Sequence, residues 1–168
     1  IAFSASAEET RRWIRRAGRA NFRVLRSGGE VVACLDLIDM GQWFGGRRVP
    51  MVGVAGVAVL PEHRAAGHGS ALMREALREM AARRTALSCL YPATEPVYRR
   101  AGYEQAGVRT LYSISVEAIG ARERTPGVRP ARPSDMAAVR RLQEGAARAG
   151  AGLLSRSAYM WDRALGRI

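Results

Sequence analysis

The clearest candidate for chemistry in the chain is a short loop of small residues. Residues 64–70 read Arg-Ala-Ala-Gly-His-Gly-Ser, so two alanines and two glycines leave the main-chain amides unshielded. A helix is predicted directly after the loop, because apolar residues recur on one face: Leu72, Met73, Ala76, Leu77 and Met80. Amides at the start of a helix bind anions, because their N–H groups and the helix dipole both favour negative charge. The loop therefore predicts a site for a phosphate-bearing ligand.

An uncharged segment before this loop is predicted to be a buried strand. Residues 51–60 contain four valines and no charge, so both faces of the strand are expected to be covered. Gly53 and Gly56 weaken a strand unless a bulge or a close backbone approach requires them. The order of strand, loop and helix makes the anion site a more specific prediction than the glycines alone. The loop has neither the dinucleotide-binding spacing nor the Gly-Lys-Ser/Thr ending of a nucleotide-triphosphate loop.

The other elements are predicted from apolar patterns and turn residues. Residues 22–25 and 30–38 are expected to form an antiparallel pair that turns at residues 27–29. A strand at residues 87–91 is expected beside residues 51–60. A helix is predicted at residues 8–17, with Trp13 and Ile14 inward, and a short helix at 97–101. A late strand is predicted at residues 109–116. A further helix is predicted to begin at Ser134 or Asp135, and the residues on its apolar face are Met136, Val139, Leu142 and Ala146.

Two motifs within these elements resemble the GNAT N-acetyltransferase superfamily. Residues 57–59, which read Val-Ala-Val, together with residues 64–70 are similar to its acetyl-coenzyme A signature. Residues 90–104 are similar to its second landmark, in which a tyrosine precedes a Gly-aromatic pair. The sequences of residues 41–46 and 91–95 are most similar to the Eis (enhanced intracellular survival) branch. The two motifs are specific in combination.

This resemblance covers residues 22–116 well and implies both a fold and a cofactor. The implied fold is α/β (α+β), with a mixed, mostly antiparallel sheet flanked by helices. The implied co-substrate is acetyl-CoA, whose pantetheine arm would pair with the strand backbone while the loop amides hold its pyrophosphate. The cofactor-binding residues implied by this correspondence are Val57, Ala58, Val59, Arg64, Ala65, Ala66, Gly67, His68, Gly69, Ser70, Thr94 and Glu95.

The resemblance also implies that Tyr98 is the catalytic residue. Attack of an amine on a thioester expels a thiolate, and a nearby phenol can protonate it or stabilise its charge. Spacing alone leaves a second interpretation open, in which Tyr98 packs a short helix against the sheet. The general base is unassigned among Glu95, Glu104, His63 and His68, which are nearby in sequence. In relatives of the Eis branch a C-terminal carboxylate from a distant domain is thought to act as the base.

Composition divides the chain into three stretches. Residues 1–118 are predicted to be the acetyltransferase domain, with N-terminal elements that look incomplete because the chain begins with Ile1. Residues 119–127 carry glycine, proline and mixed charge, which is typical of a linker. Residues 128–168 resemble the start of a second GNAT-like unit, with Tyr159, Met160 and Trp161 expected to pack.

Charge and cysteine content restrict the classes of function. The net charge is +12, and all 27 basic residues are arginine. These arginines are scattered and often lie beside glutamates, so they indicate biased coding and a solvated surface more than a nucleic-acid-binding face. Cys34 and Cys89 fall in predicted strands, which fits a reduced cytoplasmic protein but does not exclude a bridge. The sequence shows no metal-ligand spacing and no apolar run long enough to cross a membrane.

Two interpretations of function remain open from the sequence. The first is an N-acetyltransferase that moves an acetyl group from acetyl-CoA directly to a primary amine of a small molecule in a ternary complex. Similarity to Eis would make that acceptor aminoglycoside-like or polyamine-like, and the protein an oligomer. Trp43 and Phe44, in a predicted glycine-flanked loop, would anchor the loop or line the acceptor pocket. The second interpretation is a basic nucleic-acid-binding module or a catalytically silent acetyltransferase fold.

Overall fold

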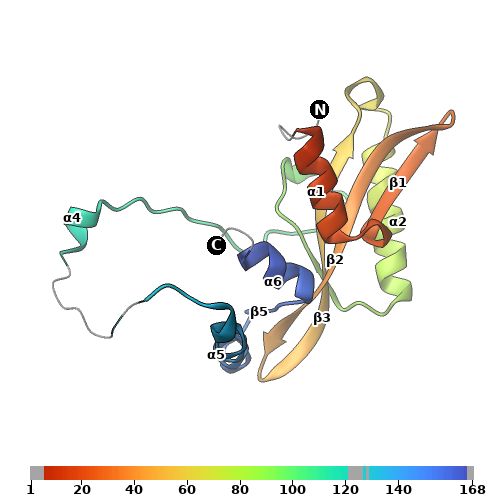
Figure 1. Cartoon of the computed structure of the whole chain (residues 1–168). Coiled ribbons are helices and arrows are strands. Elements are labelled where there is room, and N and C mark those ends of the chain that lie inside the picture. Colours follow the sequence, from red (N-terminus) through yellow and green to blue (C-terminus); the bar gives the residue numbers. More distant parts are fainter. Residues whose placement is uncertain (1–5, 121–126, 128, 166–168) are drawn as a thin grey trace.

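A mixed β-sheet lies at the centre of the molecule. The computed structural model describes residues 6–120, 127 and 129–165. The five strands are β1 (Phe22–Ser27), β2 (Glu30–Phe44), β3 (Arg47–Val59), β4 (Leu87–Cys89) and β5 (Leu154–Ser155), in the order β1-β2-β3-β4, with β5 paired to β2 (Figure 1). The α-helices are α1 (Ala7–Ala17), α2 (His68–Ala82), α3 (Glu95–Arg99), α4 (Val116–Ile119), α5 (Met136–Ala149) and α6 (Ala158–Leu165).

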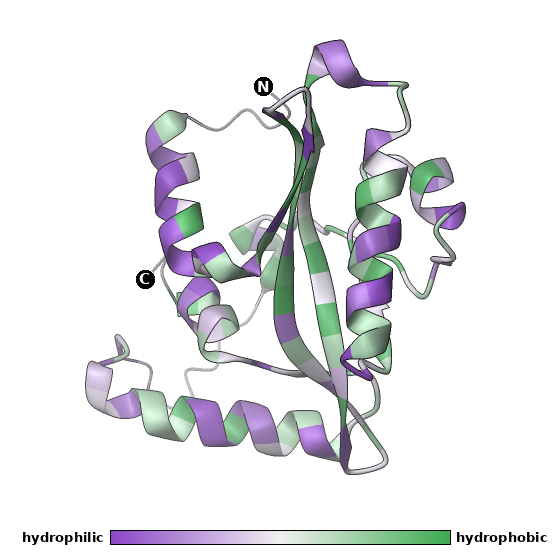
Figure 2. Cartoon of the chain, turned by 90° about the vertical axis from the view of Figure 1, so that its right-hand side faces the viewer, coloured by the Kyte–Doolittle hydropathy of each residue, from purple (hydrophilic) through white to green (hydrophobic). Residues whose placement is uncertain are grey.

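The predicted mixed, mostly antiparallel sheet flanked by helices is confirmed. β1, β2 and β3 form an antiparallel meander, whereas β4 pairs with β3 in parallel. β2 and β3 are both longer than predicted, because they continue as a hairpin to the pairing of Phe44 with Arg47. Figure 2 shows the sheet nearly edge-on, with α1 on one face and α2 on the other.

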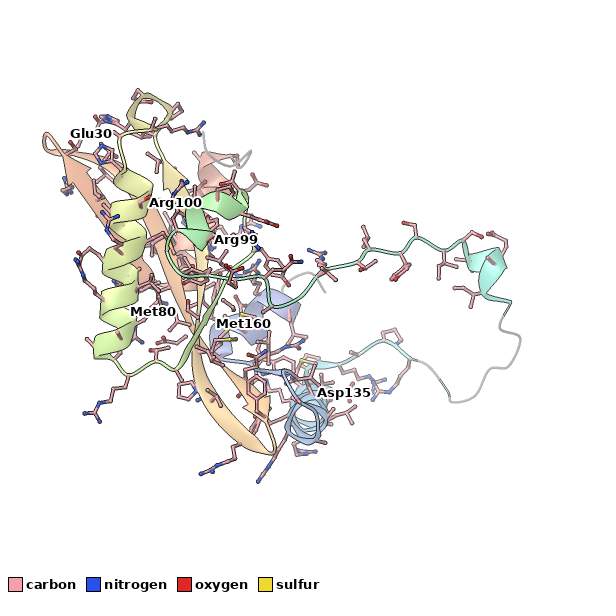
Figure 3. The ribbon with its side chains drawn as sticks, turned by 180° about the vertical axis from the view of Figure 1, so that it is seen from behind. Glu30, Met80, Arg99, Arg100, Asp135 and Met160 are labelled. Carbon is pink, nitrogen blue, oxygen red and sulfur yellow. The ribbon has the colours of Figure 1, made fainter. Side chains whose placement is uncertain are left out.

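Each face of the sheet carries its own hydrophobic core. On the α2 face, Leu35, Leu37, Val52 and Val54 of the sheet pack with Leu72, Met73, Ala76, Met80 and Tyr98. On the opposite face, Ile38, Met40 and Met51 pack with Leu154, Tyr159 and Met160. Met80 and Met160, which contribute to the two cores, are labelled in Figure 3. The central part of β3 is therefore covered on both sides, as its uninterrupted apolar sequence predicts.

The C-terminal segment packs on the α1 side of the sheet. β5 pairs with β2 at Gly41 and Gln42, and Trp161 of α6 is buried. Three hydrogen bonds join α6 to α1: Trp13 Nε1 donates to the Tyr159 hydroxyl at 3.2 Å, and Arg16 donates to the Asp162 carboxylate at 2.5 Å and to the Asp162 main-chain oxygen at 2.8 Å. Whether residues 128–168 begin a second unit stays a prediction, but their described part is docked on the first.

One sequence prediction outside the sheet is wrong. Residues 109–116 do not form a strand; they belong to an extended arm that leaves the sheet and ends in α4 (Figure 1). Leu111 and Tyr112 on this arm are 82% and 80% exposed, because no described strand pairs with it. The helix predicted to begin at Ser134 or Asp135 is confirmed as α5, although Leu142 on its apolar face is 76% exposed and the residue that α5 buries is Ala147.

Candidate active site

One edge of β3 is open next to the site that the sequence predicts. β2 pairs with β3 along its length, but β4 pairs with it at Met51, Val52 and Gly53. From Val54 to Val59 this second edge has no strand partner in the described part of the chain. The main-chain groups of an open edge can pair with an extended ligand in the way that an added strand does.

A β-bulge lies within this open part of β3. Asp36 pairs with Ala55 and Cys34 pairs with Ala58, so Gly56 and Val57 both lie opposite Leu35. Gly56 has a φ of 60°, and a Cβ atom at this position would lie 2.1 Å from Trp13 Cη2. The bulge therefore needs glycine for its backbone conformation and for the ring of α1 that packs on it.

The loop between β3 and α2 presents a series of unengaged amides. Arg64 N donates to Pro61 O at 3.2 Å, so the amide of Arg64 is used within the loop. The amides of residues 65–70 have no acceptor among the described residues, and the main-chain bonds of α2 begin with Ala71 N to Gly67 O at 2.9 Å. Gly67, with a φ of 79°, turns the chain into the helix. The arrangement matches a concave anion site at a helix N-terminus.

Arg64 also links the loop to the end of the open edge. Its Nε lies 3.4 Å from Val59 O, and its exposed guanidinium is the loop's own cationic group. Gly69 lies against β3, since a Cβ atom there would lie 3.4 Å from Val59 Cγ2. Loop and strand edge therefore form one continuous surface, with cationic charge at their junction.

Tyr98 lies on α3, on the α2 face of the sheet. It is 9% exposed, and its ring packs edge-on against Tyr103 with centroids 6.4 Å apart. Burial raises the pKa of the Tyr98 phenol, so its hydroxyl is protonated at neutral pH. No described residue hydrogen-bonds to that hydroxyl, whereas the Tyr103 hydroxyl is bonded to Ser88 Oγ at 2.6 Å. Of this pair of tyrosines, Tyr98 is the one whose hydroxyl has no described hydrogen-bond partner.

The other predicted residues around α3 and the loop are more exposed. Thr94 is the N-cap of α3 and Glu95 is its first residue. The Thr94 side chain makes no capping hydrogen bond, and both residues are exposed. Two of the candidate bases lie beside a partner of another element or turn: His63 Nε2 is 3.8 Å from a carboxylate oxygen of Glu30, and Glu104 is paired with Arg99 at 3.2 Å. Glu30 and Arg99 are labelled in Figure 3, at the loop end of the sheet and on α3. No described hydrogen bond joins any of the candidate bases to the Tyr98 hydroxyl.

A cavity of about 740 Å³ lies on the face of the sheet opposite Tyr98. It is bounded by α1, β2, β3 and α6, through residues that include Trp13, Cys34, Ala55, Gly56, Tyr159 and Arg163. Most of the lining is apolar, with arginines from α1 and α6 among its polar groups. Burial raises the pKa of the Cys34 thiol, so this cysteine is not a thiolate nucleophile at neutral pH.

Asp36 is the functional candidate that the sequence analysis missed. It is the one charged residue of a β2 segment that reads Cys-Leu-Asp-Leu-Ile, and it is 0% exposed. Neither carboxylate oxygen has a hydrogen-bond partner among the described residues. Burial raises the pKa of Asp36 to about 6, against the opposing effect of Arg163 and Arg23. A lone carboxylate within an apolar strand was the available sequence signal.

Trp43 and Phe44 do not lie in a loop. They end β2, and the turn of the hairpin is formed by Gly45 and Gly46. Trp43 exchanges main-chain hydrogen bonds with the C-terminal segment, donating to Leu153 O at 2.9 Å and accepting from Gly152 N at 2.7 Å. Neither residue lines the cavity beside Asp36. In this structure Trp43 anchors the C-terminal segment.

The described residues offer neither a metal-binding cluster nor a candidate membrane span. These residues contain no group of three or more histidine, cysteine, aspartate or glutamate side chains placed to hold a metal ion. None of the described helices combines the length and the apolar character that crossing a membrane requires. Cys34 and Cys89 are free thiols.

The chain was compared with known proteins. The model of the acetyltransferase (GNAT) domain family matches residues 2–106. A GCN5-related N-acetyltransferase from Anabaena variabilis is 32% identical over 94% of this chain, with a TM-score of 0.85. One from Kribbella flavida is 44% identical over 57% of this chain and 26% of its own, with a TM-score of 0.53. None of the curated proteins matches.

This chain spans 41% of the Anabaena protein and 26% of the Kribbella protein. Eis1 from Mycobacterium abscessus is 28% identical over 48% of this chain and 21% of its own, with a TM-score of 0.45, and this likeness does not define a branch. The match over residues 2–106 and the shared fold do define the family. The chain belongs to the GNAT acetyltransferase domain family.

Proposed function

We propose that this chain binds acetyl-CoA and transfers its acetyl group directly to a primary amine of a small molecule. The observation that carries the proposal is the alignment of the open edge of β3 with the unengaged amides of residues 65–70. The edge at Val57, Ala58 and Val59 has the hydrogen-bonding pattern that an amide-containing pantetheine arm needs. The loop offers several N–H groups to a diphosphate, with Arg64 beside them.

The proposed transfer has one bond-forming step and two proton transfers. The amine nitrogen attacks the thioester carbonyl carbon, a C–N bond forms, and the C–S bond breaks. The departing thiolate takes a proton from the Tyr98 hydroxyl, which burial keeps protonated. The nitrogen must in turn release a proton. Direct transfer is favoured over an acetyl-cysteine intermediate because Cys34, the thiol nearest the bulge, is held in its neutral form.

The proposal also names the class of acceptor and the branch of the family. We infer an acceptor of the aminoglycoside or polyamine type, because the sequences of residues 41–46 and 91–95 resemble those of Eis. The same resemblance supports a division into residues 1–118, 119–127 and 128–168, and assembly into an oligomer. The two free thiols support a cytoplasmic location. Proteolysis within residues 119–127 and light scattering test the boundary and the assembly.

Calorimetry with acetyl-CoA, followed by a thiol-release assay, tests the function itself. The assay uses 2-phenylethylamine, spermidine and kanamycin, which differ in charge and in apolar surface. Saturable binding with release of coenzyme A that depends on the amine is the expected result. Binding without release for any amine would favour the catalytically silent fold. Binding to DNA that falls steeply with salt, without acetyl-CoA binding, would contradict the proposal.

A further inference from the structure

Asp36 is a buried acid without a partner. Its side chain is wholly buried, and both oxygens lack a hydrogen-bond donor among the described residues. An ionised carboxylate in such a position is destabilising unless a cation or a hydrogen-bond donor joins it. Proteins retain such groups mainly where function requires them, so Asp36 calls for a ligand that supplies positive charge or a proton.

The position of Asp36 relates it to the cavity on the α1 side. Cys34, two residues away on the same face of β2, lines the cavity, and so does Ala55, the cross-strand partner of Asp36. Gly56, the first residue of the bulge, lines it as well. Asp36 is not itself a lining residue; it lies between these lining residues on β2 and β3, at the level of the bulge. Tyr98 belongs to the core on the other face of the sheet.

The charged groups around Asp36 come from several elements. Arg163 of α6 and Arg23 of β1 act on its carboxylate, and both favour the ionised form. At the cavity wall, α1 contributes Glu9, Arg12 and Arg16, of which Arg16 is paired with Asp162. Burial outweighs the arginines, so the pKa of Asp36 rises to about 6. A carboxylate with this property changes its protonation close to neutral pH, as a general base does.

We propose that the cavity holds the acceptor amine and that Asp36 takes up the proton that the amine must lose. This inference rests on the proposed acetyl transfer. The acceptor enters as an ammonium ion, and one N–H proton passes to an Asp36 oxygen to leave a neutral amine and a carboxylic acid. The amine then attacks the thioester from the cavity side, while Tyr98 protonates the thiolate from the opposite side of β3. Because Asp36 does not itself line the cavity, this step requires a rotamer change that carries the carboxylate past Cys34 and Ala55, whose side chains are small.

Asp36→Asn tests this role, because it keeps the shape of the side chain and removes the proton acceptor. The kcat/KM of wild type is measured from pH 5 to 10 with the best amine of the three-amine panel. We expect a rise to a plateau near the pKa of Asp36 and a fall near that of the amine, at about 10. In Asp36→Asn, kcat/KM at pH 7 falls about 10²-fold and the lower limb disappears, so the rate rises up to the amine pKa. Affinity for acetyl-CoA stays unchanged.

Asp39→Asn is the matched control, since Asp39 lies on the same strand but is exposed and paired with Arg83 at 2.7 Å. It is expected to keep the rate and the pH profile of wild type. Equal kcat/KM in wild type and Asp36→Asn, or a wild-type profile without the lower limb, would overturn the role of Asp36 while leaving acetyl transfer intact. Failure of wild type to bind acetyl-CoA would overturn the proposed function as well. Thermal unfolding of each variant shows that it is folded.

Discussion

The indole ring of Trp13 occupies the space that a side chain at position 56 would fill. A Cβ atom on Gly56 would lie 2.1 Å from Trp13 Cη2, and Gly56 has a φ of 60°. This contact fixes α1 against the bulge of β3 and closes one wall of the cavity beside Asp36. The helix, the bulge and the cavity therefore depend on one glycine.

Gly56→Ala is expected to destabilise the protein by about 2–4 kcal/mol, because it combines overpacking against Trp13 with an unfavourable φ. Urea unfolding measures the loss. Gly28→Ala is the matched control: Gly28 has a φ of 57° but nothing within 4 Å of its Cβ position. Its expected loss is about 1 kcal/mol, which isolates the backbone effect. Equal losses in the two variants would show that the Trp13 contact does not constrain position 56.

Asp36 makes stability depend on pH in a defined direction. Its pKa of about 6 in the folded protein lies above its ordinary value, so the native state binds the extra proton between about pH 4 and 6. The free energy of unfolding therefore loses a contribution of up to about 3 kcal/mol as pH rises through this window. Asp36→Asn removes this pH-dependent contribution to the free energy of unfolding. Urea unfolding should show the variant gaining stability over wild type between pH 4 and 7; a constant difference would contradict it.

The predicted anion site is tested by a negative charge in the loop. Ala66→Asp is expected to weaken acetyl-CoA binding about tenfold, because the carboxylate repels the diphosphate and competes for the same amides. Ala82→Asp adds the same charge at the far end of α2, beyond the range of strong electrostatic interaction, and should bind as wild type does. Calorimetry measures both, and equal affinities would exclude the loop as the phosphate site.

Tyr98→Phe removes the proton that the departing thiolate needs. We expect kcat to fall about 10²-fold while the Kd of acetyl-CoA is unchanged. Tyr103→Phe serves as the control, since the hydroxyl of Tyr103 is already bonded to Ser88. Stopped-flow thiol release separates the two variants. Unchanged turnover in Tyr98→Phe would leave Tyr98 with a packing role alone.

Local sequence signals were sufficient for the elements around the loop. The uninterrupted apolar run of β3, the glycines of the β1–β2 turn and the apolar face of α2 each reflect interactions within one or two neighbouring elements. Gly67 and the small residues beside it likewise indicated a loop whose amides are unengaged. These features lie close together in sequence, so a local pattern describes them.

Predictions that depended on distant partners were wrong or were missed. Residues 109–116 alternate as a strand does, but in the described chain no strand pairs with them. Trp43 is surrounded by glycines that indicated a loop, yet Gly41 instead accommodates the side chain of Arg48 across the hairpin, 2.6 Å from a Cβ position. The isolation of Asp36 depends on α6, about 120 residues later, folding back over β2. The charge of Asp36 within an apolar strand was a local signal, but the distant contacts that bury it have no signature in the adjacent sequence.

The central claim is that the open edge of β3 and the amides of residues 65–70 bind acetyl-CoA together. A titration of labelled protein with acetyl-CoA, followed by the ¹H–¹⁵N chemical shifts of individual amides, tests it most directly. We predict that the largest saturable shifts occur at Val57, Ala58, Val59 and residues 65–70. Saturable shifts confined to other parts of the sheet, or none at millimolar acetyl-CoA, would contradict the account.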